Sequence, residues 1–320
     1  MASIVVVGSI NLDIVASAMR LPTPGAKVTD ALLMRHPGGG GANQALAARR
    51  LGANVVLLGR VGHDAEADAA LALLRESGVD LAGVVTVPEA ATGIALIAVA
   101  ASGENQIVVA PGANLRLTSE NLRLPAVDAL IGEHLAPGDA VARTIENFEG
   151  FTCVTLATSS EVDDVVLRGS DLVVVNESEA AWYADSLALR DGLVAKTSGA
   201  SGAVLYRSRE QLARASSPAV EAVDGFVPGL LARFGDVERQ HDPPVLAVDD
   251  LSVLCCSVFG EAPLGRQRLQ TGRRVRRDRQ HPHAVLAGER HARWRDRRRR
   301  DHRQVLLQWQ QLQAGVIERE

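Results

Sequence analysis

The sequence predicts an α/β fold in which a mainly parallel sheet is flanked by helices. Hydrophobic residues make up 47% of the 320-residue chain, aromatic residues only 3%, and the chain contains 29 glycines. A core of Ala, Val and Leu with many glycine turns suits this class better than a β-sandwich rich in Tyr and Trp. Strand and helix signals also alternate along the first 120 residues, which is typical of βα units.

The expected elements of the first 80 residues alternate, because short apolar runs are followed by segments of helical periodicity. Glycines follow both expected helices, at Gly52 and Gly78, as is usual where a helix ends. The elements are, in order, a strand at Ile4–Val7, a glycine turn at 38–41, a helix at 42–52, a strand at Val55–Leu58 and a helix at Ala65–Ser77.

An antiparallel piece interrupts this pattern. Residues 93–100 and 105–110 have strand-like alternation and are joined by the turn Ser102–Glu104, which predicts a hairpin rather than a βαβ unit. The remaining expected elements are a buried strand at 171–175, a strand, glycine turn and strand within 193–206, and a strand with a helix at 220–234.

An irregular, Arg-rich region is expected at 235–320, where the periodicity fails. Residues 261–320 hold 16 Arg against 7 acidic residues, whereas residues 1–260 carry 18 basic and 31 acidic residues. Such a basic segment can bind nucleic acid. The alternative is a displaced reading frame, because the chain has 32 Arg but only two Lys. We favour the second interpretation over a nucleic-acid partner, because no regular interleaving of aromatic residues and no known motif accompanies the charge.

Membrane, secreted and cysteine-metal classes are not expected. No apolar run reaches the roughly 18 residues of a membrane helix, and the opening residues have no signal-peptide pattern. The three cysteines show no C-x-x-C spacing, so no metal-ligand residues are assigned. We therefore expect a cytoplasmic protein without a membrane partner.

Candidate sugar-binding residues follow the first strand. Asn11 and Asp13 are two residues apart, so in an extended segment both side chains point to one side. An amide and a carboxylate together can donate to and accept from neighbouring hydroxyls of a polyol. The alternative is an Asx turn that satisfies the local backbone. The following glycines at 38–41 allow a ligand to approach the backbone closely, and the start of the next helix offers N–H groups.

Four segments, in order, resemble the ribokinase branch of the PfkB carbohydrate kinases. They are 6-VVGSINLDIV-15, 37-PGGGGANQALAARRLGA-53, 60-RVGHDA-65 and 103-GENQIVVAPGAN-114. The resemblance covers residues 1 to about 130 and returns at about 161–234. It implies a ribokinase-like α/β domain at 1–234, a small β lid formed by about 10–18 and 92–110, and a homodimer paired through that lid.

The resemblance also assigns binding residues. In the family, the positions matching Asn11, Asp13, Gly39, Gly40, Gly41, Ala42 and Asn43 hold the sugar. The segment 175-VNESE-179 resembles a motif that arranges Mg²⁺ and phosphate, which proposes Asn176 and Glu179; a helix-capping box would give the same spacing. The segment 197-TSGASG-202 resembles a turn against ATP and proposes Thr197, Ser198, Gly199, Ala200, Ser201 and Gly202, although a simple turn between strands is the alternative.

The implied reaction transfers the γ-phosphoryl group of ATP to the primary hydroxyl of D-ribose, with Mg²⁺ and K⁺ as further cofactors. The segment 103–114 favours ribokinase over fructokinase or adenosine kinase relatives. However, the family motif D-T-x-G-A-G-D is absent, and 220-VEAVDGFVPGLLARF-234 stands in its place. Asp224 is the only candidate catalytic base; the alternative is a helix N-cap.

Other positions also depart from the family. Gly40 stands where the family usually has a lysine, and only Glu146 is available as a candidate for an expected sugar-contacting glutamate. The monovalent-cation residues have no match after Gly235. Three hypotheses therefore stay open: a ribokinase-type kinase, a sugar-binding protein without catalysis, and another PfkB sugar or nucleoside kinase.

Overall fold

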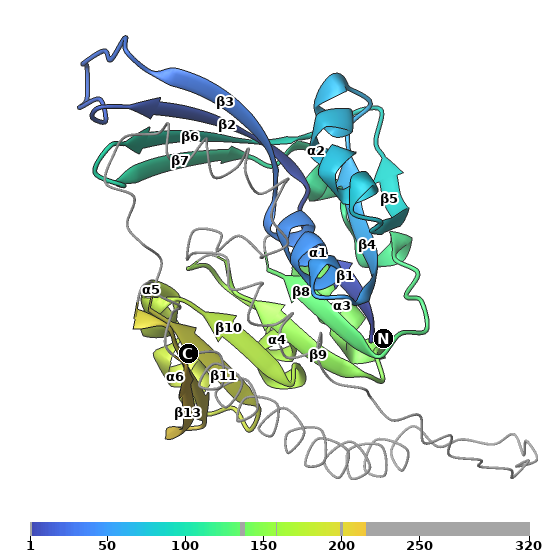
Figure 1. Ribbon diagram of the computed structural model, residues 1–320. Helices are drawn as coiled ribbons and strands as arrows, with labels where there is room; N and C mark the ends of the chain where they lie inside the picture. Colours follow the sequence, from blue (N-terminus) through green and yellow to red (C-terminus); the bar gives the residue numbers. More distant parts are fainter. Residues whose placement is uncertain (1, 135–137, 158, 199–200, 216–320) are drawn as a thin grey trace, which may run out of the picture.

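The computed structural model describes residues 2–134, 138–157, 159–198 and 201–215. These residues form a nine-stranded sheet and a separate four-stranded sheet (Figure 1). The strands of the large sheet are parallel except for β12, which pairs antiparallel with both β11 and β13, and this confirms the predicted class. Its strands, in spatial order, are β13 (Glu210–Ala215), β12 (Ala203–Arg207), β11 (Leu193–Thr197), β10 (Leu172–Val175), β9 (Phe151–Thr155), β8 (Ala129–Glu133), β1 (Ser3–Val7), β4 (Asn54–Val61) and β5 (Asp80–Thr86).

Helices cover both faces of the large sheet. Both faces of strand β1 are apolar and need cover. Ile4 and Val6 pack into the core beneath α1 and α2, whereas Val5 and Val7 pack into the core on the opposite face. All four side chains have no exposed surface, and burying each contributes about 1.5–3 kcal/mol relative to exposure. The helices are α1 (Gly40–Arg50), α2 (Ala65–Glu76), α3 (Gly138–Asn147), α4 (Asp164–Gly169), α5 (Glu177–Trp182), α6 (Ala184–Ala188) and the 3₁₀ turns η1 (Gly112–Arg116) and η2 (Ser119–Asn121).

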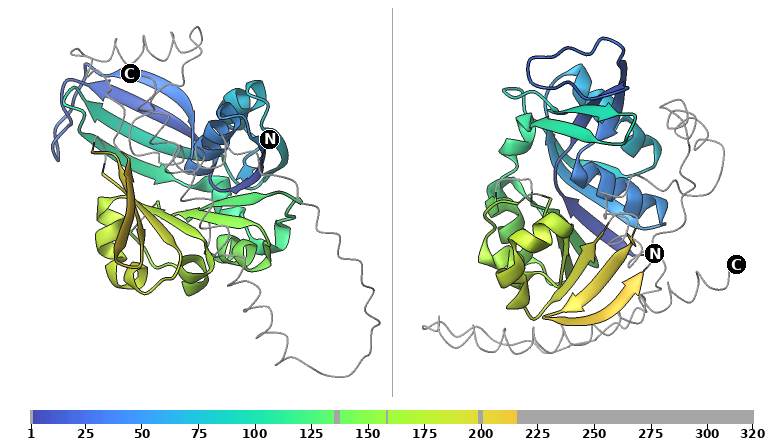
Figure 2. Two further views of the ribbon diagram at one scale, coloured as in Figure 1. Left: turned by 60° about the horizontal axis from the view of Figure 1, so that its bottom comes forward. Right: turned by 90° about the vertical axis from the view of Figure 1, so that its left-hand side faces the viewer.

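The four-stranded sheet, which we call the lid, projects from one side of the molecule (Figure 2). Its order is β3 (Leu32–Gly38), β2 (Asn11–Ala18), β6 (Gly93–Ala100) and β7 (Asn105–Ala110). Strands β6 and β7 pair antiparallel, as the alternation of their residues predicts, whereas β2 and β6 pair in parallel. Strand β3 was not predicted, because its sequence LLMRHPG lacks regular alternation.

The observed helix bounds lie close to the predicted ones. Helix α1 begins at Gly40, two residues before the expected start. Gly52 has φ +90° just after this helix, as expected for a residue that follows a helix end. The strand and helix predicted at 220–234 and the irregular region at 235–320 lie outside the described residues. In the described part of the chain, no helix is long and apolar enough to cross a membrane.

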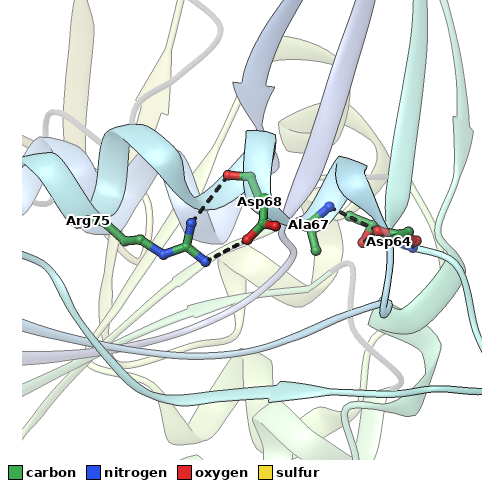
Figure 3. Close-up of polar contacts among 5 residues, drawn as sticks. Asp64, Ala67, Asp68 and Arg75 are labelled. Atoms are coloured by element: carbon green, nitrogen blue, oxygen red, sulfur yellow. Dashed lines mark hydrogen bonds and ion pairs between the residues drawn. The ribbon is translucent and has the colours of Figure 1, made fainter.

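Asp64 ties the start of α2 to the base of the lid. Its Oδ1 accepts from the Ala67 amide at 2.9 Å, which caps the helix (Figure 3). Its Oδ2 accepts from the Thr92 amide at 2.8 Å, and Thr92 directly precedes β6. Burial alone would raise the pKa of Asp64, but hydrogen bonds from Thr92 and Ala67, together with His63, lower it below the usual 3.8. The ionised carboxylate therefore stabilises this junction.

We predict that Asp64→Ala lowers the free energy of unfolding by about 1–2 kcal/mol, as expected when a helix cap is lost. Asp64→Asn keeps an acceptor for the Ala67 amide but has no second acceptor for the Thr92 amide. Its free energy of unfolding should therefore lie between those of the wild type and Asp64→Ala. Because the folded pKa of Asp64 is depressed, the advantage of wild type over Asp64→Asn should be complete above about pH 5 and shrink as the pH falls below about 4. Urea unfolding from pH 3 to 7 measures this difference; a pH-independent difference would contradict the assignment.

Candidate functional site

A buried carboxylate joins three segments at the carboxyl edge of the large sheet. Glu133, the last residue of β8, is 1% exposed. Its Oε2 accepts from the Ser9 amide at 2.7 Å, from the Ser9 hydroxyl at 2.7 Å and from the Gly41 amide at 2.8 Å. Ser9 follows β1 and Gly41 lies in the first turn of α1. Glu133 thus fixes the position of α1 relative to the ends of β1 and β8.

Close packing against Glu133 and against the backbone of residues 8–11 explains the glycines at 39–41. A Cβ atom at Gly40 would lie 2.1 Å from Glu133 Oε1, and one at Gly41 would lie 2.6 Å from the backbone of Gly8. Gly39 has φ +93°, and a Cβ there would lie 2.7 Å from the Ser9 carbonyl oxygen. A side chain at position 40 would therefore require the Glu133 carboxylate to move.

The N–H groups at the start of α1 are used within the protein. The Gly40 amide donates to the Ser9 hydroxyl at 3.1 Å, and the Gly41 amide donates to Glu133. The amides of Ala42 and Asn43 donate to backbone carbonyls of Ser9 and Gly39 at 3.0 and 2.9 Å. The expectation that free amides of this helix face the sugar is therefore wrong, because a glutamate from β8 already satisfies the helix start.

Asn11 and Asp13 lie on one face of β2, two residues apart, next to the start of α1. Asn11 pairs with Gly38 on β3. A Cβ at Gly38 would lie 2.2 Å from Asp13 Oδ2, so the carboxylate covers this glycine. Asn11 is 5% exposed, and its Oδ1 accepts from Asn114 Nδ2 at 2.9 Å. The structure thus brings Asn11 and Asp13 beside Gly38 and Gly39, at the start of α1.

The candidate nucleotide residues follow the neighbouring strands β10 and β11. Asn176 and Glu179 form a complete capping box at the start of α5. Asn176 Oδ1 accepts from the Glu179 amide at 2.8 Å, and Glu179 Oε2 accepts from the Asn176 amide at 2.9 Å. This bonding gives the two residues a structural role and fixes the direction of both side chains. Their oxygen atoms are of the kind that Mg²⁺ prefers.

The segment 197–202 forms a tight connection between β11 and β12. Thr197 is 3% exposed and donates to the Val175 carbonyl oxygen at 3.3 Å. The Ser198 amide donates to the Gly202 carbonyl, and the Ser201 amide to the Ser198 carbonyl, both at 2.9 Å. The other residues proposed for phosphate binding and catalysis, Gly199, Ala200 and Asp224, lie outside the described residues.

Both sets of candidates lie at one edge of the large sheet. In the strand order, β8 and β9 separate β1 from β10. A hydrogen bond links these parts: Gln44 Nε2 on α1 donates to Thr155 Oγ1 at the end of β9 at 2.9 Å. In open α/β sheets, ligands bind beyond the carboxyl ends of the strands. The arrangement can therefore hold a polyol near β1 and an anionic second ligand near β10 and β11.

The structure also shows residues that the sequence did not indicate. Glu133 is the glutamate at this site. Glu146 lies on α3, which leads away from the end of β8, and it forms an exposed ion pair with Arg143 at 3.3 Å. Asn114 was present in a recognised segment, but its contact with Asn11 spans 103 residues. The one sequence signal for Glu133 as a site residue is its position at the end of the apolar run ALIGE, where a buried strand ends.

Burial lowers the pKa of His134, the residue after β8, although its hydrogen bond with the Glu161 carbonyl oxygen acts in the opposite direction. Burial therefore favours the neutral form of His134. Among the residues that the structure describes, no group of three His, Cys, Asp or Glu side chains could hold a metal ion.

The fold and site define an α/β protein with a polar site between strand ends and a β lid, a class to which sugar kinases belong. Residues 1–227 match the model for the pfkB family carbohydrate kinases. Because this match covers more than half of the chain, the protein belongs to the pfkB family, and its matched relatives are of the ribokinase type.

Two ribokinases illustrate the similarity. The Haemophilus influenzae ribokinase is 34% identical over 186 residues, which cover 56% of this chain and 61% of that protein. The mouse ribokinase is 31% identical over 248 residues, covering 70% of this chain and 77% of that protein. The chain spans between 35% and 61% of the length of the first relatives matched.

The fold is also that of solved ribokinases. The Arabidopsis thaliana ribokinase, solved with ribose and ATP, superposes with a TM-score of 0.60 at 22% identity. The match covers 81% of this chain and 90% of that structure. This likeness supports the described fold. The ligand has to be inferred from the residues of the site.

We predict that Glu133→Ala destabilises the protein by about 3 kcal/mol, because the Ser9 and Gly41 donors lose a buried acceptor. Glu146→Ala is the matched control: it removes only an exposed ion pair and should change the free energy of unfolding by less than about 0.5 kcal/mol. Thermal and urea unfolding measure both. Equal effects of the two substitutions would contradict the central role of Glu133.

Proposed function

We propose that this protein is a ribokinase-type sugar kinase that transfers the γ-phosphoryl group of ATP to the primary hydroxyl of D-ribose. The observation that carries the proposal is the placement of Asn11 and Asp13 on one face of the lid strand β2, beside the start of α1. Membership of the pfkB family supports sugar phosphorylation as the reaction class.

The acceptors and donors near β2 suit an uncharged sugar. Asp13 can accept from hydroxyl groups, and the Asn11 amide can donate to one. Burial disfavours the charged form of His134, and Glu133 is an acid, so these two residues do not favour an anionic sugar. We therefore place the pentose between β2 and the first turn of α1.

ATP is the proposed second ligand, placed at the carboxyl ends of β10 and β11. Asn176, Glu179 and the turn after Thr197 would line its site, and Mg²⁺ bound with the nucleotide would neutralise phosphate charge. The sugar hydroxyl oxygen forms the new bond to the γ-phosphorus, the bond between that phosphorus and the ADP oxygen breaks, and Asp224 is the proposed acceptor of the hydroxyl proton. ATP as donor is consistent with a cytoplasmic location.

We expect D-ribose to bind the full-length protein with heat measurable by calorimetry, and Asp13→Asn and Asn11→Ala each to weaken this binding about tenfold or more. Asp68→Asn is the control, since Asp68 lies exposed on α2 in an ion pair with Arg75 (Figure 3). No heat with millimolar ribose, or an equal loss in the Asp68 variant, would contradict the sugar assignment.

A sugar-binding protein without catalysis is the second candidate, because the D-T-x-G-A-G-D motif is absent from the sequence. A coupled assay for ADP release with ribose, Mg²⁺ and K⁺ distinguishes the two. Turnover that falls in Asp224→Asn supports the kinase; ribose binding without turnover supports the binding protein. Ribose-dependent turnover that Asp224→Asn leaves unchanged would keep the kinase and remove Asp224 as its base.

A homodimer through the lid is part of the same proposal. Strand β7 is exposed along its whole length. Ile14, Leu96 and Val108 are neighbours across β2, β6 and β7, on the face opposite Asp13. Leu96 is 51% exposed and Val108 66%. Side chains of this kind, gathered on one face, are typical of a surface that another chain covers.

We expect light scattering to give twice the 33.9 kDa mass of the chain. Leu96→Glu should convert this species to monomers, because a carboxylate would be buried without a partner. Ile107→Glu is the matched control on the other face of the lid, where the side chain is 54% exposed. A dimer that survives Leu96→Glu but not Ile107→Glu would assign the interface to the opposite face, and a wild-type monomer would contradict the dimer.

A further inference from the structure

The side chain of Asn114 holds both the backbone before Asn11 and the Asn11 side chain itself. Asn114 lies in η1 and is 3% exposed. Its Oδ1 accepts from the Ile10 amide at 2.9 Å, and its Nδ2 donates to the Ile10 carbonyl oxygen at 3.1 Å. The same Nδ2 donates to Asn11 Oδ1 at 2.9 Å.

These bonds determine the direction of both amides. The Ile10 backbone offers one donor and one acceptor, so the Asn114 amide can satisfy both in only one orientation. In that orientation Asn114 presents an N–H group to Asn11, and only the Asn11 oxygen can accept it. The Asn11 oxygen is therefore occupied, and its Nδ2 makes no hydrogen bond within the ranges that the structure describes.

Strand β6 is shaped to allow this contact. A Cβ at Gly93, the first residue of β6, would lie 2.2 Å from Asn11 Oδ1 and 2.4 Å from Asn114 Nδ2. Gly93 pairs with Asn11 between parallel strands. Glycine at this position therefore leaves room for the two amides to meet at the base of the lid.

We propose that Asn114 is a positioning residue that makes Asn11 a hydrogen-bond donor toward the sugar. Asp13, two residues along the same face, is an acceptor. The pair then fits neighbouring hydroxyls of which one accepts from Asn11 and another donates to Asp13. This inference rests on the proposed sugar site and adds which group each residue presents.

A double-mutant cycle tests the proposal by ribose calorimetry on the full-length chain. In Asn114→Asp, the introduced carboxylate cannot donate to Asn11, so the Asn11 amide should turn and present its oxygen to the sugar. We expect Asn114→Asp to weaken ribose binding about tenfold in the wild-type background. In the Asn11→Ala background it should have an effect of less than about twofold to threefold.

The unfolding midpoint, measured for all four proteins, separates positioning from stability. If Asn114 is only structural, Asn114→Asp should weaken binding equally in both backgrounds, which would overturn the proposal. Asp68→Asn, on the exposed side of α2, is a control that leaves the amide pair and the lid unchanged and should leave ribose affinity unchanged.

A second measurement does not require sugar binding. In the ¹⁵N-labelled protein, the side-chain amide signals of Asn11 are assigned through their loss in Asn11→Ala. These protons should exchange with water faster than those of Asn114, and Asn114→Asp should slow them. Slow exchange at Asn11 that is insensitive to Asn114→Asp would overturn the proposal. Absence of ribose heat in the wild type would instead contradict the proposed function, while the exchange result would still decide the amide orientation.

Discussion

The site depends on one buried carboxylate, that of Glu133. Hydrogen bonds to a charged group contribute roughly 1.5–3 kcal/mol each, and this carboxylate accepts three, from Ser9 and Gly41. Removing a carboxylate from water costs several kcal/mol, so such a group persists only where its partners are well placed. Because these partners belong to different segments, Glu133 aligns the end of β1 with the start of α1. The glycine at position 40 leaves room for this carboxylate, and the glycine at position 41 leaves room for the backbone of Gly8 and Ser9.

Much of the fold could be predicted because it is encoded locally. The apolar run Ile4–Val7, the alternation in β6 and β7 and the apolar face of α2 each indicate their structure within a few residues. Strand β3 and Glu133 could not be predicted in this way. Strand β3 forms because β2 is its partner, and Glu133 acts through residues more than 90 positions away. The glycine turn was recognised, but its amides were expected to face a ligand, since the sequence does not reveal an acceptor from another strand.

Sugar binding and phosphoryl transfer are separable in this chain. The residues that position Asn11 and Asp13 all lie before residue 134, in β1, β2, α1, η1 and β8, and they are bonded to one another. The proposed base, Asp224, belongs to a different stretch of sequence, where the family motif is missing. An altered sequence there would remove the proposed proton acceptor and leave the positions of Asn11 and Asp13 unchanged. The kinase and the binding protein therefore differ first in phosphoryl transfer.

The two faces of the lid serve the proposed sugar binding and the proposed dimer contact, because successive side chains of a strand point to opposite faces. Asp13 and Ile14 are adjacent on β2, so one faces the proposed sugar and the other the opposite surface. The base of the lid is held by Asp64 at Thr92 and by Asn114 at Ile10. A partner bound on the Ile14 face would therefore restrain the same strand that carries Asn11 and Asp13. Dimer formation would reduce the freedom of the lid before the sugar arrives, so that less conformational entropy is lost on binding.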